Sequence, residues 1–488
     1  MVKVRTFLLL VFLLIPTLLQ AQEQGIKTYR LSLDEIIQLA LENNFDIQLA
    51  KYDTLISRQD EKSAKSIYDT VLDAELGYQK DQSQQTSSIF GTKNVTNEYN
   101  VGLSQRLPTG TKVRLGLDNT RNATNSVFST SPVTHDSAFG VSVSQDLGKN
   151  FLGIQDRGNI KLTMLAVENT QYTSLEIIEH NIADVQKAYW DLVLAMERVD
   201  IENDMLAQSK QLYDLHQRKL KDGLVEPPEA YQSEANYKKR INQLKIAENE
   251  VENRRETLKL LLNIDDTRAV IVPTEKLVLD NDNLVLSQIL KTAIENRRDY
   301  KKALNEVKRK DLNLSMKKNN LWPEINLSAS LERNGLGDHF DQSIEEAIDK
   351  DNPNFMAGLT VEYPIFNSDA RAKLKKAEYE KARQLVYLKF IERKIAMEAV
   401  NNLRDRNVLY EVAQNAENIA LIHAEKLREE EKRFNKGRSD TDTLVRFQED
   451  LIQARYEAAQ AKYQYRLAVI ELKNVTGTLL KQYWNEEI

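Results

Sequence analysis

Hydrophobic residues recur at two different periods in the first part of this chain. Leu33, Ile36, Ile37 and Ala40 open a helical pattern that predicts one helix over residues 32–66. From Tyr68 the period changes to two, which predicts strands over 71–78, 99–105, 111–117 and 138–144. The polar stretches 82–97 and 119–136 are expected to be loops between these strands, which together occupy about 70–147.

A very long helix follows the strands. Apolar residues from Leu175 to Val199 step alternately by three and four positions, as in a coiled-coil seam. The helix predicted over 160–221 would be about 90 Å long. Gly223 and the two prolines after it predict a tight tip over 222–228, followed by a return helix over 229–262 and an irregular linker over 263–283.

The same order of elements then returns. We expect a helix at about 285–320, strands within 325–363 separated by a loop at 333–354, and a long helix over 369–435. A tip at 436–441 and a return helix at 442–476 follow, and residues 477–488 form a C-terminal tail. The first repeat is therefore 22–262 and the second is 284–476. The seam from Leu444 to Val475 has an apolar residue at every third or fourth position.

The chain is an internal duplication. Residues 31–50 align with 284–303 at an offset of 253, whereas Gly223 aligns with Gly437 at an offset of 214. The 39-residue difference lies after the first strand, where a hairpin around Pro108 and Gly110 has no counterpart in the second copy. A duplicated unit of this kind usually needs its partner copy to cover its hydrophobic face.

Composition narrows the class of protein. A formal net charge of −6 argues against nucleic-acid binding, and the absence of cysteine excludes disulfides, thiolate metal sites and a lipid-anchored N-terminal cysteine. Residues 1–21 look like a signal peptide, because Lys3 and Arg5 precede an apolar run from Phe7 to Leu19. The alternative for this run is an N-terminal membrane anchor.

Sites for chemistry are not evident in the sequence. The five histidines are scattered without ligand spacing, and the acidic clusters at 280–283 and 349–352 lack the calcium-loop pattern. Phosphate-loop and nucleophile-elbow motifs are absent as well. We therefore expect no enzyme activity, no metal and no cofactor.

The two tips carry a family resemblance. The segments Arg218–Val225 and Arg433–Gly437, together with the helix from Leu451 to Tyr465, resemble the TolC-like outer-membrane efflux protein family over residues 28–480. The resemblance implies a mainly α fold with β: antiparallel coiled-coil hairpins form a periplasmic tunnel, and strands from three chains share one β-barrel in the outer membrane. It also implies a homotrimer that contacts outer-membrane lipid, a periplasmic adaptor and an inner-membrane pump, and that binds no nucleic acid.

Physical reasoning agrees with a shared barrel. Six strands from one chain leave an open sheet edge, and an open edge is not tolerated in lipid. Helices of about 90 Å far exceed the thickness of a bilayer and must project from it. Three chains would supply 18 strands if the extra hairpin joins the barrel and 12 if it does not.

The resemblance assigns roles to the tips. Adaptor docking would fall on Gly223, Leu224, Val225, Gly437, Arg438 and Ser439, and a periplasmic constriction would be formed by Glu226, Glu229, Asp440, Asp442 and Arg446. Family members often carry two aspartates after the second tip, but the ungapped positions here are Thr443 and Arg446. An acidic constriction would therefore depend on Asp440 and Asp442.

Two other classes of protein remain as alternatives to a passive exit duct in a tripartite efflux or type I secretion system. A periplasmic adaptor also has a leader and a helical hairpin, but it would need one hairpin nested between β-rich domains. A coiled-coil scaffold would need no leader and no strands. The sequence leaves open whether the cargo is a drug, a metal ion or a polypeptide.

Overall fold

The computed structural model describes residues 28–84, 89, 91–129, 131–266, 268–280, 283–350 and 352–483. The expected signal peptide and the last five residues of the tail lie outside these ranges. The strands are β1 (Thr28–Leu31), β2 (Val71–Asp81), β3 (Asn94–Arg106), β4 (Thr111–Thr124), β5 (Val133–Asp146), β6 (Val270–Pro273), β7 (Glu324–Gly337) and β8 (Pro353–Glu362). The helices are α1 (Leu33–Asn43), α2 (Phe45–Lys65), α3 (Ile154–Lys221), α4 (Pro227–Leu261), α5 (Leu286–Asn296), α6 (Arg298–Asn319), α7 (Phe340–Asp349), α8 (Ser368–Asn435) and α9 (Thr441–Val475).

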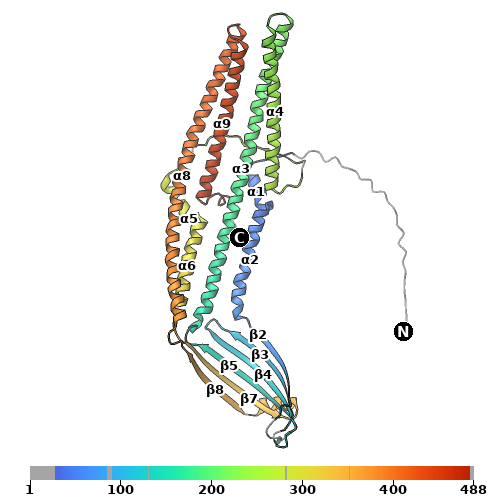
Figure 1. Ribbon diagram of the computed structural model, residues 1–488, viewed down its shortest axis with the longest axis vertical. Coiled ribbons are helices and arrows are strands. Elements are labelled where there is room, and N and C mark those ends of the chain that lie inside the picture. Colours follow the sequence, from blue (N-terminus) through green and yellow to red (C-terminus); the bar gives the residue numbers. More distant parts are fainter. Residues whose placement is uncertain are drawn as a thin grey trace, which may run out of the picture.

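Two long helices run the length of the helical part (Figure 1). α3 and α8 each have 68 residues, and α4 and α9 each have 35. Ser368 follows Ile154 by 214 positions, and Thr441 follows Pro227 by the same 214. At about 1.5 Å per residue each long helix spans about 100 Å. α3 is longer than the sequence predicts, because it begins at Ile154 rather than at residue 160. The two hairpin tips lie at one end of the molecule and the sheet at the other.

The helix expected over 32–66 is broken, and so is the helix expected over 285–320. Asn44 has extended backbone angles between α1 and α2, and its side-chain oxygen accepts a hydrogen bond from the Ile47 amide at 3.1 Å. Arg297 takes the same extended conformation between α5 and α6, at the position 253 residues later. A single polar residue therefore ends one helix and begins the next in both copies.

Six strands form one antiparallel sheet in the order β2-β3-β4-β5-β7-β8. The extra hairpin, β3 and β4, lies inside this sheet rather than beside it. The expected loop at 333–354 is wrong in part, because it contains α7, which packs on β5 and β7. Gly335 permits this contact, since an added Cβ would fall 2.3 Å from the Ala347 nitrogen.

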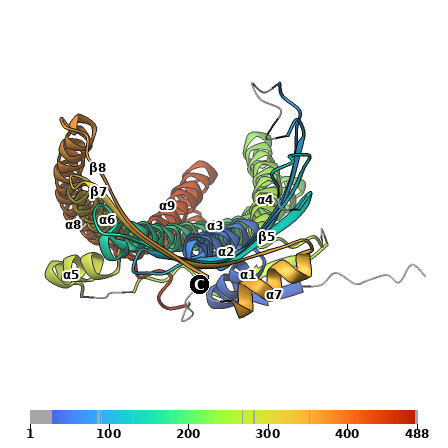
Figure 2. The same cartoon turned by 90° about the horizontal axis from the view of Figure 1, so that it is seen from below.

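The two faces of the sheet differ in polarity. One face carries a row of apolar side chains that are partners across all six strands, namely Leu72, Leu103, Leu115, Val141, Leu331 and Phe355. Five of these six side chains are between 43 and 69 % exposed. α7 covers part of the same face, where the Ser137 and Ser343 hydroxyls lie 2.6 Å apart. Viewed from below, the sheet is curved and α7 lies on its convex side (Figure 2).

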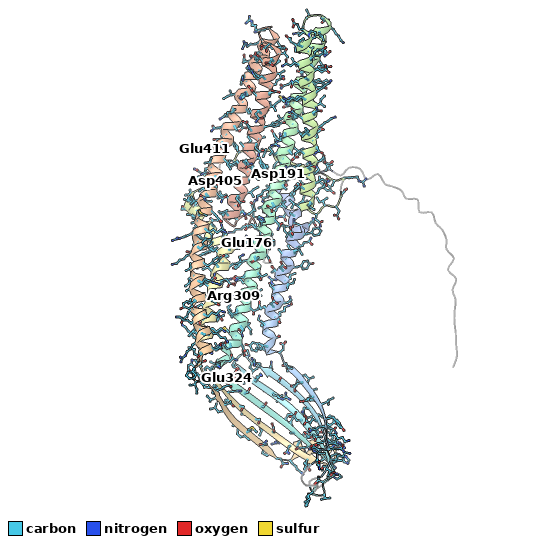
Figure 3. The ribbon with its side chains drawn as sticks, in the orientation of Figure 1. Glu176, Asp191, Arg309, Glu324, Asp405 and Glu411 are labelled. Carbon is cyan, nitrogen blue, oxygen red and sulfur yellow. The ribbon has the colours of Figure 1, made fainter. Side chains whose placement is uncertain are left out.

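The helical part has charged side chains along its whole length (Figure 3). Glu176 and Asp191 lie on α3, Arg309 on α6, and Asp405 and Glu411 on α8. Within the described residues, no helix is both long enough and apolar enough to cross a membrane.

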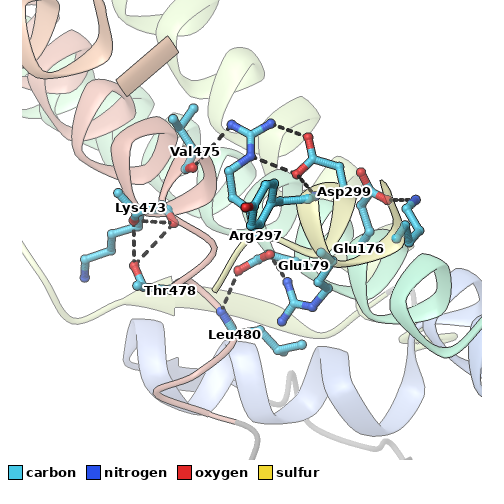
Figure 4. A network of polar contacts seen from close by, with 12 residues as sticks. Glu176, Glu179, Arg297, Asp299, Lys473, Val475, Thr478 and Leu480 are labelled. Carbon is cyan, nitrogen blue, oxygen red and sulfur yellow. Dashed lines mark hydrogen bonds and ion pairs between the residues drawn. The ribbon is translucent and has the colours of Figure 1, made fainter. Parts of the chain in front are cut away.

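A polar network joins the two repeats halfway along the helices (Figure 4). Glu179 on α3 accepts hydrogen bonds from Arg298 and from the Leu480 amide, the latter at 3.2 Å. Arg297 donates to Asp299 at 2.7 Å and to Glu398 on α8 at 2.5 Å. Burial raises the pKa of Glu179, although the charge of Arg298 opposes this shift. These contacts fix the helix break to both long helices.

Candidate functional site: the tips of the two helical hairpins

Both tips turn with the same backbone geometry. Gly223 has φ +70° and Gly437 has φ +67°, a left-handed conformation that costs other residues about 1–2 kcal/mol. The Leu224 amide donates to the Lys219 carbonyl at 2.8 Å, and the equivalent Arg438 amide donates to Arg433 at 2.9 Å. The space around both glycine Cα atoms is open. Glycine is therefore needed at these positions for its conformation and not for close packing.

The return helices begin in different ways. Asp440 caps α9, since its carboxylate accepts a hydrogen bond from the Thr443 amide at 2.7 Å. This hydrogen bond lowers the pKa of Asp440, and the charge of Arg446 adds to the shift. Glu226 holds the equivalent position before α4 but makes no side-chain cap, and Pro227 follows it. The second tip is thus fixed by hydrogen bonds and the first by proline.

Polar contacts connect the two tips. Gln232 on α4 donates to the Asp442 carboxylate on α9 at 2.9 Å. His216 on α3 lies 3.3 Å from the Thr441 hydroxyl, measured from its Nε2 atom. Lys239 and Glu449 form a third link at 2.7 Å, one to two turns further from the tips. The tips of a single chain are therefore held together by side chains from both repeats.

His216 is the buried member of this set. It is 1 % exposed, and its ring lies against Phe434 with 6.2 Å between ring centroids. Burial lowers the pKa of His216, although the Glu229 carboxylate opposes the shift. Sequence analysis missed this residue because a lone histidine carries no pattern. The duplication offers one signal, since His216 and the buried Glu430 hold equivalent positions 214 residues apart.

An apolar cluster lies behind these contacts. Ile201, Met205 and Leu212 of α3 pack with Leu427 of α8 and with Leu444, Val445, Leu451 and Ile452 of α9. Cores of this kind contribute most of the free energy that holds packed helices together. The hairpins therefore meet along α3 and α9, which leaves α4 and α8 at the two sides.

The other expected site residues described below do not form contacts between the two tips. Leu224 is 73 % exposed, and Arg438 projects from the second tip as an exposed residue. Ser439 donates to Glu430 within its own hairpin. Arg446 lies over the Phe447 ring at 5.6 Å rather than pairing across the tips. Of the five residues expected at a constriction, Asp442 alone has a hydrogen bond to the other hairpin among the described residues.

Both lateral sides of the molecule are exposed and apolar. α8 packs on α6, α6 on α3 and α3 on α2, so α8 and α2 are the outer helices next to the sheet. Exposed side chains on α2 repeat at helical spacing (Phe45, Leu49, Tyr52 and Ile56), and α8 has a similar series (Val386, Phe390 and Met397). β2 and β8 form the corresponding edges of the sheet. One chain alone therefore has an unpaired surface along each side.

Metal-binding groups were not found in the part of the chain that the structure describes, where no three His, Asp or Glu side chains lie close enough to hold an ion. The geometry of the tips provides hydrogen bonding and packing between helices. It does not bring together a nucleophile with a base.

The fold is shared with solved structures of outer membrane channels. The chain is similar to the CmeC channel of Campylobacter jejuni (TM-score 0.66, 15 % identity, covering 93 % of this chain and 87 % of that one). It is similar to VceC of Vibrio cholerae (TM-score 0.66, 12 % identity, 91 % and 96 % covered). It is also similar to the open state of MtrE from Neisseria gonorrhoeae (TM-score 0.66, 18 % identity, 92 % and 89 % covered).

One family model matches the second repeat. Residues 289–478 match the model of the family described as "Outer membrane efflux protein". No curated protein has a matching sequence. The resemblance inferred from the tip motifs is confirmed, and the expected fold of helical hairpins with barrel strands is confirmed by the solved channels.

Proposed function

We propose that this protein is the outer-membrane exit duct of a tripartite export system, a passive channel without catalytic chemistry of its own. In this proposal three copies close a barrel in the outer membrane and continue as a helical tunnel into the periplasm. A periplasmic adaptor and an inner-membrane pump act at the hairpin tips. The family match and the shared fold support this class of function.

The observation that carries the proposal is the sheet. A continuous apolar row crosses the outer face of all six strands and is left exposed, as expected for a surface that contacts lipid. The edges β2 and β8 remain unpaired in one chain. Lipid does not tolerate such edges, so further copies are needed to close the sheet.

Strand direction permits that closure. The sheet is antiparallel throughout and has an even number of strands, so its two edge strands run in opposite directions. β8 of one copy can therefore pair antiparallel with β2 of the next. Three copies would then form a barrel of 18 strands, since the extra hairpin lies within the sheet, and barrels of about this size enclose an aqueous channel.

The tips are the proposed gate and docking surface. Gly223, Leu224, Val225, Gly437, Arg438 and Ser439 would face the adaptor, and their exposed turns support this role. Glu226, Glu229, Asp440, Asp442 and Arg446 would line the constriction. Opening would separate the hairpins at the Gln232–Asp442 and His216–Thr441 contacts, while the network around Arg297 stays fixed.

A cross-link tests the gate directly, because the natural chain has no cysteine. Gln232→Cys and Asp442→Cys, joined by a short bis-maleimide, should abolish export while the trimer remains in the outer membrane. Each single variant treated with the same reagent serves as the matched control and should export normally. Unchanged export by the linked protein would refute gating at this contact.

Heat-modifiable migration of the protein from an outer-membrane fraction tests the channel itself. Barrel trimers resist detergent until they are heated, so an SDS-stable trimer and single-channel current in a planar bilayer are expected. Recovery as a water-soluble periplasmic monomer without conductance would contradict the proposed function and favour a scaffold.

A further inference from the structure

The polar face of the sheet is hollowed and has its own order of charges. A hollow of about 900 Å³ on this face is lined by residues that alternate with the apolar ones, among them Ser104, Arg114, Ser142, Ser330 and Glu332. If three copies close a barrel with the apolar face outward, this face lines the lumen. The inference below therefore rests on the proposed function.

Strand register places the charges of this face in rows. Asp146, Glu324 and Glu362 lie on this face at the helix end of β5, β7 and β8. The next row contains Arg106 and Lys112, which are partners on β3 and β4, and the row after it contains Arg114. All charged residues in the following rows are carboxylates. They are Asp73 and Glu332 in one row, Glu75 and Asp118 in the next, Glu98 and Asp136 in the one after that, and Asp81 at the end of β2.

Basic residues at that end of the described strands lie on the opposite face. Lys80, Arg121 and Arg333 occupy alternate positions to the carboxylates on β2, β4 and β7, so their side chains project outward. At the end of the strands far from the helices, the two signs of charge therefore lie on opposite faces of the sheet.

An ion pair marks the boundary between the two bands. Arg114 reaches Asp73 at 2.8 Å across Gly102, where an added Cβ would fall 2.7 Å from the guanidinium. Gly116 and Gly140 continue this row to Glu332, whose Cγ would lie 2.7 Å from a Cβ on Gly140. Three glycines in register thus let charged side chains lie flat along the wall. No ion pair with a described residue is formed by Glu75, Glu98, Asp118, Asp136 or Glu332.

The electrostatic effect of these rows is cumulative. Successive inward rows are about 7 Å apart, which is close to the Debye length of about 8 Å at physiological salt. Their potentials therefore overlap instead of being screened individually. Like charges on a water-filled wall raise the local concentration of the opposite ion.

We propose that the strand end of the channel is a cation-accumulating vestibule, formed by Glu75, Glu98, Asp118, Asp136 and Glu332 of each chain and bounded by the Arg106, Lys112 and Arg114 band. It favours passage of small cations and cationic cargo over anions. Selectivity is thereby set at the exit, at the far end of the molecule from the helical tips.

Reversal potentials in a planar bilayer with a KCl gradient test this proposal on the intact trimer. The natural protein should prefer K⁺ over Cl⁻ several-fold. The isosteric triple variant Glu75→Gln, Glu98→Gln and Asp118→Asn should lower the permeability ratio toward one. Its SDS-stable trimer confirms that the variant has folded.

Two controls locate the effect. Asp341→Asn, Glu345→Gln and Asp349→Asn remove exposed carboxylates from α7, at the same end of the sheet but on its outer face, and should leave the ratio unchanged. Asp440→Asn with Asp442→Asn should change conductance more than selectivity. A non-selective natural channel, or an equal loss in the α7 variant, would overturn the vestibule while leaving the exit duct intact. Absence of any current would overturn both.

Discussion

The two hairpin tips have identical backbones and different side-chain chemistry. Helices of equal length enter and leave both turns, and each turn has a left-handed glycine. The second tip is stabilised internally, by the Asp440 cap and the Ser439–Glu430 hydrogen bond. The first tip has Pro227 in place of Thr441 and is held mainly through Gln232 and His216, which reach across to its neighbour. The two copies thus share the backbone geometry of their turns, whereas their side chains contribute differently to the contact between the tips.

The largest expected effect is on the packing between the hairpins. Leu444→Ala should lower the free energy of unfolding by about 2–5 kcal/mol, because a buried leucine leaves a cavity. Leu224→Ala, which changes an exposed leucine in the turn of the first tip, should cost less than about 0.5 kcal/mol. Denaturation midpoints of the two variants measure the difference, and equal shifts would show that Leu224 is also packed.

Replacing the tip glycines tests the symmetric part of the comparison. Gly223→Ala and Gly437→Ala should each cost about 1–2 kcal/mol, because only the left-handed backbone is affected and no neighbour obstructs the methyl group. Thermal unfolding of the two variants should agree within error. Unequal costs would mean that the two turns are not equivalent in the assembled protein.

Replacing the residue before each return helix should affect the stability of the two tips differently. Asp440→Ala should cost about 1 kcal/mol through loss of the helix cap, whereas Glu226→Ala should be close to neutral because Glu226 makes no cap. Amide hydrogen exchange in the first turn of α9 and of α4 reports each effect locally. Comparable exchange in both variants would argue against the assigned difference.

The final expected effect depends on pH. Burial lowers the pKa of His216, so the folded tip binds fewer protons than the unfolded one. The stability from neutral His216 is complete above the unfolded pKa of about 6.5 and is lost as pH falls below it toward the folded pKa. Lys219 and Glu229 are the charged groups that act on this ring. Protection of the tips from protease should therefore decline between pH 7 and pH 5, and His216→Gln should remove that dependence.

Much of the fold followed from local pattern. The heptad seams, the tip glycines and the alternating strands each depend on neighbours in the chain, so they could be predicted within a few residues. The breaks at Asn44 and Arg297 could not, because the apolar periodicity continues across them and the interruption depends on contacts with α4, α8 and α9. α7 was missed for a similar reason, since its helix is stabilised by packing on the sheet.

The site shows the same division. Its turns and residue types were evident in the sequence, but the pairing of Gln232 with Asp442 and of His216 with Thr441 joins residues more than 200 positions apart. The duplication, the helix lengths, the tips and the alternation of the strands were determined by the sequence itself, because they arise from short-range spacing. The placement of the extra hairpin within the sheet and the grouping of carboxylates in rows on one of its faces were decided only by tertiary structure, because strand order and register bring distant residues into common rows.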